Sequence, residues 1–106
     1  MILVQAIIQP TKLSTVQAAL EEAGYGDVAI GDALGYGRQK GQTALFRGNE
    51  YKIELLRKVT IEIAIDEDDL EDVVAVIRGA SRTGSEGQIG DGKIFVLPVA
   101  SMIAID

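Results

Sequence analysis

Hydrophobic residues recur at every second position towards the end of the segment Lys52–Ile65. The alternating apolar residues are Val59, Ile61, Ile63 and Ile65. A period of two predicts a β-strand with one buried face. The near-continuous apolar run Met1–Ile8 predicts a second strand, more deeply buried, which Pro10 ends.

Apolar residues at helical spacing mark two further segments. The first has a capping-box pattern at Ser14 and Gln17, although Pro10 and Thr11 permit an earlier start, and it is expected to end at Gly24. Its apolar positions are Leu13, Val16, Leu20 and Ala23. The second covers residues 67–80, and its acidic start suits the positive end of a helix dipole. Its apolar positions are Leu70, Val73, Ile77 and Ala80.

Weaker patterns complete the predicted sheet. Residues 27–34 predict a strand that Gly31 weakens, residues 93–97 predict a final strand, and the tail 101–106 is expected to add a short strand at an edge. The order is strand–helix–strand, a long loop, then strand–helix–strand. This order predicts one α+β domain over residues 1–106 with a ferredoxin-like split βαβ fold, in which both helices cover one face of an antiparallel sheet.

The sheet face away from the helices is expected to be apolar too. Ile2 and Val4, together with Ile61 and Ile63, supply more apolar surface than two short helices can cover. A small domain gains stability by burying such a face against copies of itself. We therefore expect a homo-oligomer, and the sheet geometry suits a closed ring.

Composition narrows the chemistry. The chain contains neither cysteine nor histidine, which excludes disulfides, thiolate catalysis and imidazole chemistry. Its net charge of −6 opposes general nucleic-acid binding. The acidic run at 66–72 is interpreted as a solvated helix start, not as a metal site. With no long apolar run and no signal peptide, we expect a cytoplasmic protein that is not inserted in a membrane and is not an enzyme.

Two glycine-rich segments contribute little to a core. The first, residues 35–51, reads GYGRQKGQTALFRGNEY. It suits a solvated hairpin loop, yet structureless loops beyond about 12–15 residues are uncommon in compact domains unless they have a function. The second, residues 82–95, reads RTGSEGQIGDGKIF and leaves glycine N–H groups free to approach an anion. Neither contains the P-loop pattern, so each alone is weak evidence for phosphate binding.

Together with LLRKVTIEI at residues 55–63, these segments resemble the PII signal-transduction family (nitrogen regulatory protein P-II), from Met1 to about Val99. The resemblance implies a homotrimer that holds an adenine nucleotide, ATP or ADP, or else AMP, between neighbouring subunits. The residues that it implies for the nucleotide site are Gly35, Gly37, Arg38, Gln39, Gly90, Asp91, Gly92 and Lys93. It further implies that Gln39 helps to hold Mg²⁺ between ATP and 2-oxoglutarate and that Lys58 pairs with 2-oxoglutarate. The alternative for Lys58 is a solvent-facing charge.

The resemblance also identifies the 35–51 loop, the family's T-loop between the second and third strands, as an effector arm. Its implied targets are ammonium transporters or enzymes of nitrogen metabolism. Tyr51 stands where some members are uridylylated, and the alternative is a tyrosine packed where the next strand begins. Two other functions stay open. One is a divergent regulator that prefers ADP or AMP and responds to another small anion such as bicarbonate; the other is a structural oligomer that binds no nucleotide.

The sequence departs from the family pattern in three places. The 82–95 loop is longer by the group 85–87 (Ser, Glu, Gly). Glu86 in this group adds a negative charge near the expected phosphates; the alternative, which we expect, is an outward bulge. Gln9 replaces a basic residue that supports the 2-oxo acid in many members. Ala104 and Asp106 stand where two arginines reach nucleotide phosphates, and the family tail beyond them is absent, so either the chain stops early or its ligand preference is altered. Because each lost charge-assisted contact costs roughly 1.5–3 kcal/mol, we expect nucleotide binding with a weakened preference for ATP.

Overall fold

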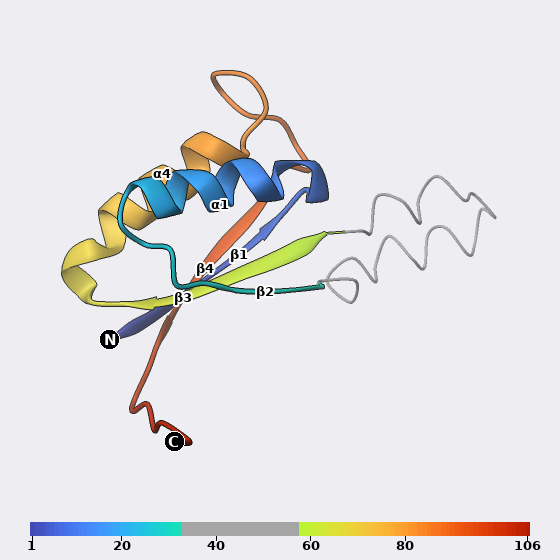
Figure 1. The fold of residues 1–106 in the computed structure, drawn as a ribbon. Coiled ribbons are helices and arrows are strands. Elements are labelled where there is room, and N and C mark those ends of the chain that lie inside the picture. Colours follow the sequence, from blue (N-terminus) through green and yellow to red (C-terminus); the bar gives the residue numbers. More distant parts are fainter. Residues whose placement is uncertain (33–57) are drawn as a thin grey trace.

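The structure, a computed structural model, describes residues 1–32 and 58–106, and all structural statements below refer to these two ranges. The elements in chain order are β1 (Ile2–Ile8), the 3-10 turn η1 (Pro10–Lys12), α1 (Leu13–Glu22), β2 (Ala29–Asp32), β3 (Val59–Ile65), the 3-10 turn η3 (Glu67–Asp69), α4 (Leu70–Ser81) and β4 (Gly92–Pro98) (Figure 1).

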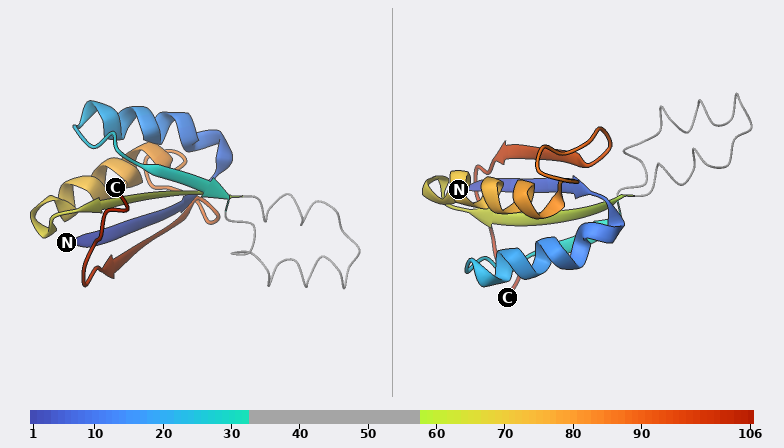
Figure 2. Two further views of the ribbon diagram at one scale, coloured as in Figure 1. Left: turned by 60° about the horizontal axis from the view of Figure 1, so that its bottom comes forward. Right: turned by 90° about the horizontal axis from the view of Figure 1, so that it is seen from above.

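The four strands form one antiparallel sheet in the order β2-β3-β1-β4. Both helices lie on the same side of this sheet, as Figure 1 and the turned views of Figure 2 show. The α+β arrangement with the split βαβ order expected from the sequence is therefore confirmed.

The core lies between the helices and one face of the sheet. In β1 and β3 every second side chain faces the helices, and the facing residues pair across the strands, as Val4 pairs with Ile63. The largest fully buried side chains are Ile8, Leu20, Ile61, Ile77, Val4, Val16 and Val73. Burial of aliphatic side chains at this density is the main source of stability in a sheet-and-helix layer.

The expectation about surplus apolar surface was assigned to the wrong residues. Ile2, Val4, Ile61 and Ile63 are all buried, at 8%, 0%, 0% and 6% exposure. They belong to the core cluster beneath the helices and leave no surplus. The exposed apolar side chains on the other face come instead from β4, where Phe95 and Leu97 pair with Gln5 and Leu3 of β1.

At the start of α1 the structure shows the earlier of the two starts that the sequence permits. The helix begins at Leu13, directly after η1, and Ser14 is therefore inside the helix and caps nothing. The reason is Pro10, whose fixed φ is compatible with the first position of a helical turn and moves the start upstream. The predicted end at Gly24 is confirmed, since Gly24 has a φ of +96°.

The outer segments are less regular than expected. Within the described residues, β2 covers only Ala29–Asp32. The tail 101–106 forms no strand, which contradicts the expected edge strand, and all its residues are exposed. The last backbone bond before the tail runs from the N–H of Val99 to the carbonyl of Met1, 3.2 Å away. None of the described helices has the length and apolarity needed to cross a bilayer.

Candidate functional site

A cleft of about 690 Å³ opens where β4 begins. Its walls are the last turns of α4, the loop between α4 and β4, and the first residues of β4. Three residues of the predicted nucleotide site, Asp91, Gly92 and Lys93, line this cleft. The described part of the predicted site therefore meets at one end of the sheet, against the C-terminal end of β1.

Asp91 holds the loop closed. Its carboxylate accepts hydrogen bonds from the Thr83 N–H at 2.7 Å, the Thr83 hydroxyl at 2.7 Å and the Gln88 N–H at 2.8 Å. These three donors keep the pKa of Asp91 below its usual value, the Thr83 N–H being the strongest cause. Both carboxylate oxygens of Asp91 therefore accept hydrogen bonds within the loop. The role of Asp91 in the cleft is to shape its rim.

The longer loop does not bulge clear of the cleft, so that expectation is wrong. Glu86 and Gly87 line the cleft, and Gln88, just after the extra group, donates to Asp91. Gly87 has a φ of +83°, and a Cβ there would lie 3.3 Å from Asp91 Oδ2 and 3.4 Å from the Cβ of Arg82. The loop therefore folds back tightly on Asp91 and Arg82.

Gly92 and Gly90 fix the loop to the strand below. At Gly92, whose φ is +136°, an added Cβ would overlap the carbonyl oxygen of Ile7 and lie 3.2 Å from the Cα of Ile8. Gly90 does not line the cleft, and its carbonyl accepts a hydrogen bond from Gln9 Nε2 at 2.9 Å. Gln9, which replaces the basic residue of many family members, thus serves as a support for the loop.

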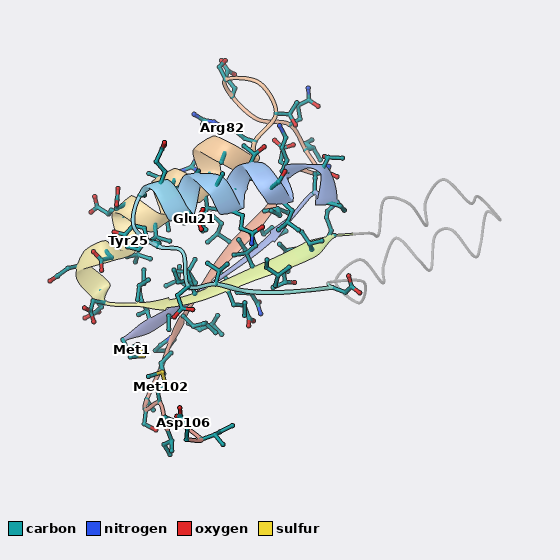
Figure 3. All side chains as sticks on the ribbon, in the orientation of Figure 1. Met1, Glu21, Tyr25, Arg82, Met102 and Asp106 are labelled. Carbon is teal, nitrogen blue, oxygen red and sulfur yellow. The ribbon has the colours of Figure 1, made fainter. Side chains whose placement is uncertain are left out.

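Two arginines that are absent from the set expected from the sequence lie in the cleft wall. Arg78 and Arg82, in the last turn of α4 and at its C-cap, both line the cleft. Figure 3 labels Arg82 at the foot of the loop. The signal available in the sequence was their spacing of four residues at the end of a predicted helix that leads directly into the glycine-rich loop.

The remaining predicted positions fall into two groups. Gly35, Gly37, Arg38, Gln39 and Tyr51 lie outside the described residues, together with the whole 35–51 loop. Lys58, in contrast, is described and immediately precedes β3.

The positions of the missing arginines lie far from the cleft of the same subunit. Gly92 pairs with Ile8 at one end of β1 and Pro98 pairs with Ile2 at the other, so the tail leaves the sheet at the opposite end. Figure 3 shows Asp106 at that opposite end. Neither Ala104 nor Asp106 therefore reaches the cleft of its own chain.

Two further polar groups lie away from the cleft. Gln5 Nε2 donates to Glu62 Oε2 at 2.6 Å on the sheet face without helices. The Tyr25 hydroxyl, just after α1, is within hydrogen-bond distance of Asp72 at 3.0 Å and Asp69 at 3.2 Å. The hydrogen bond to Asp72 is the main cause that raises the pKa of Tyr25 to about 12. The described ranges contain no cluster of acidic side chains arranged to hold a metal ion.

Comparison with known proteins agrees with this arrangement. The sequence model of the family described as "Nitrogen regulatory protein P-II" matches residues 1–106. Two relatives with that name, from Synechocystis sp. and Nostoc punctiforme, are 48% and 47% identical over 102 residues, which cover 96% of this chain and 88% of each relative. The crystal structure of Arabidopsis thaliana PII bound to citrate matches with a TM-score of 0.74 at 34% identity, covering 98% of this chain and 81% of that one. The chain therefore belongs to the nitrogen regulatory protein P-II family.

Proposed function

We propose that this chain is a PII-type signal transducer that binds adenine nucleotide in the cleft at the start of β4 and reports the bound state to protein targets through the 35–51 loop. The observation that carries the proposal is the cleft itself, in which the glycine backbone around Gly92 stands beside Lys93. Exposed glycine N–H groups and cationic side chains are the chemistry that phosphate oxygens require. The proposed role is regulation and not catalysis.

A homotrimer is part of the proposal. In support, β4 exposes Phe95 at 39% and Leu97 at 41% on the sheet face that the helices leave open. The tail adds Met102, Ile103 and Ile105 at 68%, 85% and 105% exposure. Apolar side chains exposed in this number favour burial against a second copy. Because the tail leaves its own cleft behind, its contact with a nucleotide would be made in a neighbouring subunit.

The effector and the targets follow from family membership. Gln39, with Mg²⁺, and Lys58 are the residues proposed to bind 2-oxoglutarate next to ATP. The proposed targets are an ammonium transporter or a metabolic enzyme in the cytoplasm, contacted through the 35–51 loop and regulated through Tyr51 in cells that modify it. The citrate bound to the Arabidopsis protein is consistent with a family site for small polyanions.

Calorimetric titration of the purified chain with ATP, ADP and AMP, with and without Mg²⁺ and 2-oxoglutarate, tests this proposal. We expect saturable binding of ATP and ADP with affinities within about tenfold of each other, because Ala104 and Asp106 bring no cation to the phosphates. Tight ATP binding with strong 2-oxoglutarate synergy would contradict the weakened preference. Binding of ADP or AMP that changes with bicarbonate and not with 2-oxoglutarate would assign the alternative regulator of inorganic-carbon metabolism. No nucleotide binding at all would leave only a structural oligomer.

A further inference from the structure

All lysines and arginines of residues 1–32 and 58–106 lie at one end of the sheet. Lys12 is in η1 just after β1, Lys58 precedes β3, and Lys93 is the second residue of β4. Arg78 is in the last turn of α4 and Arg82 is its C-cap. The strand pairing places the starts of β3 and β4 together, because Val59 and Gly92 both pair with Ile8. A chain with a net charge of −6 thus keeps a local concentration of positive charge around the cleft.

The opposite end of the sheet is acidic. β3 ends there at Ile65, opposite Ile2, and the acidic run of η3 and the first turn of α4 follows immediately. Asp72, the last residue of that run, lies in the first turn of α4, whereas Arg78 lies in its last turn and Arg82 is its C-cap. Among the described residues neither arginine has an ion-pair partner. Asp91, a carboxylate of the adjoining loop, already accepts three hydrogen bonds from Thr83 and Gln88.

The two arginines form one wall. Residues four apart lie on the same side of a helix, and both of these line the cleft. The stem of Arg82 passes beside Gly87 of the loop, since a Cβ at Gly87 would lie 3.4 Å and 3.9 Å from its Cβ and Cδ. Arg78 and Arg82 are both exposed, so a ligand in the cleft can reach their guanidinium groups.

We propose that Arg78 and Arg82 bind a phosphate group of the nucleotide from the α4 side of the cleft and so supply, within one subunit, cationic contacts that Ala104 and Asp106 do not supply. This inference rests on the proposed function and adds two specificity-determining residues to it. Each guanidinium offers a planar fork of N–H donors that matches two oxygens of a phosphate. Lys93 contributes a further positive charge from the sheet face without helices, since it pairs with Ile7 of β1. Glu86, in the same cleft, limits the total attraction.

The test compares charge removal inside and outside the cleft. Arg78→Met, Arg82→Met and the double variant keep an apolar stem, and Lys12→Met is the matched control because Lys12 acts on Asp91 electrostatically but does not line the cleft. We expect each arginine variant to lose about tenfold in ATP affinity and the double variant about a hundredfold, measured by calorimetry. Lys12→Met should lose less than about threefold, and adenosine, which has no phosphate, should bind all variants equally. Arg82→Lys should recover part of the loss.

Three results would overturn the inference. The first is unchanged ATP affinity in the double variant. The second is an equal loss of ATP affinity in Lys12→Met, which would indicate only a long-range electrostatic effect. The third is an equal loss of adenosine affinity in the arginine variants, which would indicate a disrupted loop. If the wild type binds no nucleotide, the proposed function fails by itself. Titration with pyrophosphate then tests the two arginines directly. Pyrophosphate binding that the double variant loses supports their role, and no binding by the wild type refutes it.

Discussion

Substitution of Gly92 by alanine tests whether close approach to β1 positions the loop. An added Cβ would lie 3.0 Å from the carbonyl carbon of Ile7 and 3.2 Å from the Cα of Ile8, and it would overlap the Ile7 oxygen between them. All three atoms belong to the backbone of a central strand, so no side-chain rotation relieves the overlap. The start of β4 must move by about 1 Å to restore ordinary contact.

Gly90→Ala is the matched control. Gly90 also has a positive φ, +98°, but a Cβ there meets nothing within 4 Å. Gly90→Ala therefore has only the cost of the backbone conformation, about 1–2 kcal/mol. Gly92→Ala adds the overlap with β1, for which we expect at least about 2 kcal/mol more.

The assay is urea unfolding followed by far-ultraviolet circular dichroism at one fixed subunit concentration, because oligomerisation makes apparent stability depend on concentration. Calorimetry with ATP on the same samples reports whether the cleft is lost with the displaced strand start. We expect Gly92→Ala to lower the free energy of unfolding more than Gly90→Ala and to weaken ATP binding more. Equal stability of the two variants would refute the reasoning that contact with Ile7 holds the loop in place.

Four further outcomes are expected. Asp91→Asn should destabilise the fold at neutral pH. The pKa of Asp91 in the folded chain lies below its ordinary value of 3.8. The difference in stability from the wild type should therefore vanish in acid-unfolding curves as pH falls through that lower pKa. Tyr25→Phe should also destabilise the fold, and because the pKa of Tyr25 is raised from 10.0 to about 12 on folding, the difference should persist below pH 10.0 and disappear as pH rises to about 12 in urea unfolding. Glu86→Gln should strengthen ATP binding severalfold at low salt and less at high salt, measured by calorimetry, with no change for adenosine. Leu97→Asp should convert the proposed trimer to monomers in light scattering, whereas an oligomer of unchanged mass would show that β4 is not in the interface.

The main elements follow from periodicity because one physical cause dominates them. Alternation in 59–65 and the four-residue spacing of Val73 and Ile77 both reflect a single buried face, and the structure places those residues in the core. The start of α1 was harder to predict, since the Ser14 pattern and Pro10 both permit a helix start and only the turn η1 shows which one operates.

Which apolar side chains are exposed depends on packing, which a sequence does not contain. Ile2 and Ile63 look the same in the sequence as the exposed Leu97, and only the register shows which face each side chain takes. The apolar run in the tail 101–106 suits a strand, but no described strand of the same subunit pairs with it. A strand pattern without a partner cannot satisfy its backbone hydrogen bonds within one chain.

The candidate site divides in the same way. Gly92 and Lys93, which line the cleft, could be selected from the sequence because the backbone and cationic chemistry that suits phosphate is visible there. That Asp91 turns into the loop was not, since the same carboxylate pattern suits a ligand contact or a loop clamp. Arg82 was not predicted, because it lines the cleft only in a chain whose loop folds back and brings Gly87 beside it.

The most direct test of the account is the mass of the purified chain by light scattering, followed by calorimetric titration of that same species with ATP. We predict a trimer that binds one ATP at each subunit, with an affinity that falls when Arg78 and Arg82 are both replaced by methionine. A monomer, or a trimer that gives no heat with ATP at millimolar concentration, would contradict it.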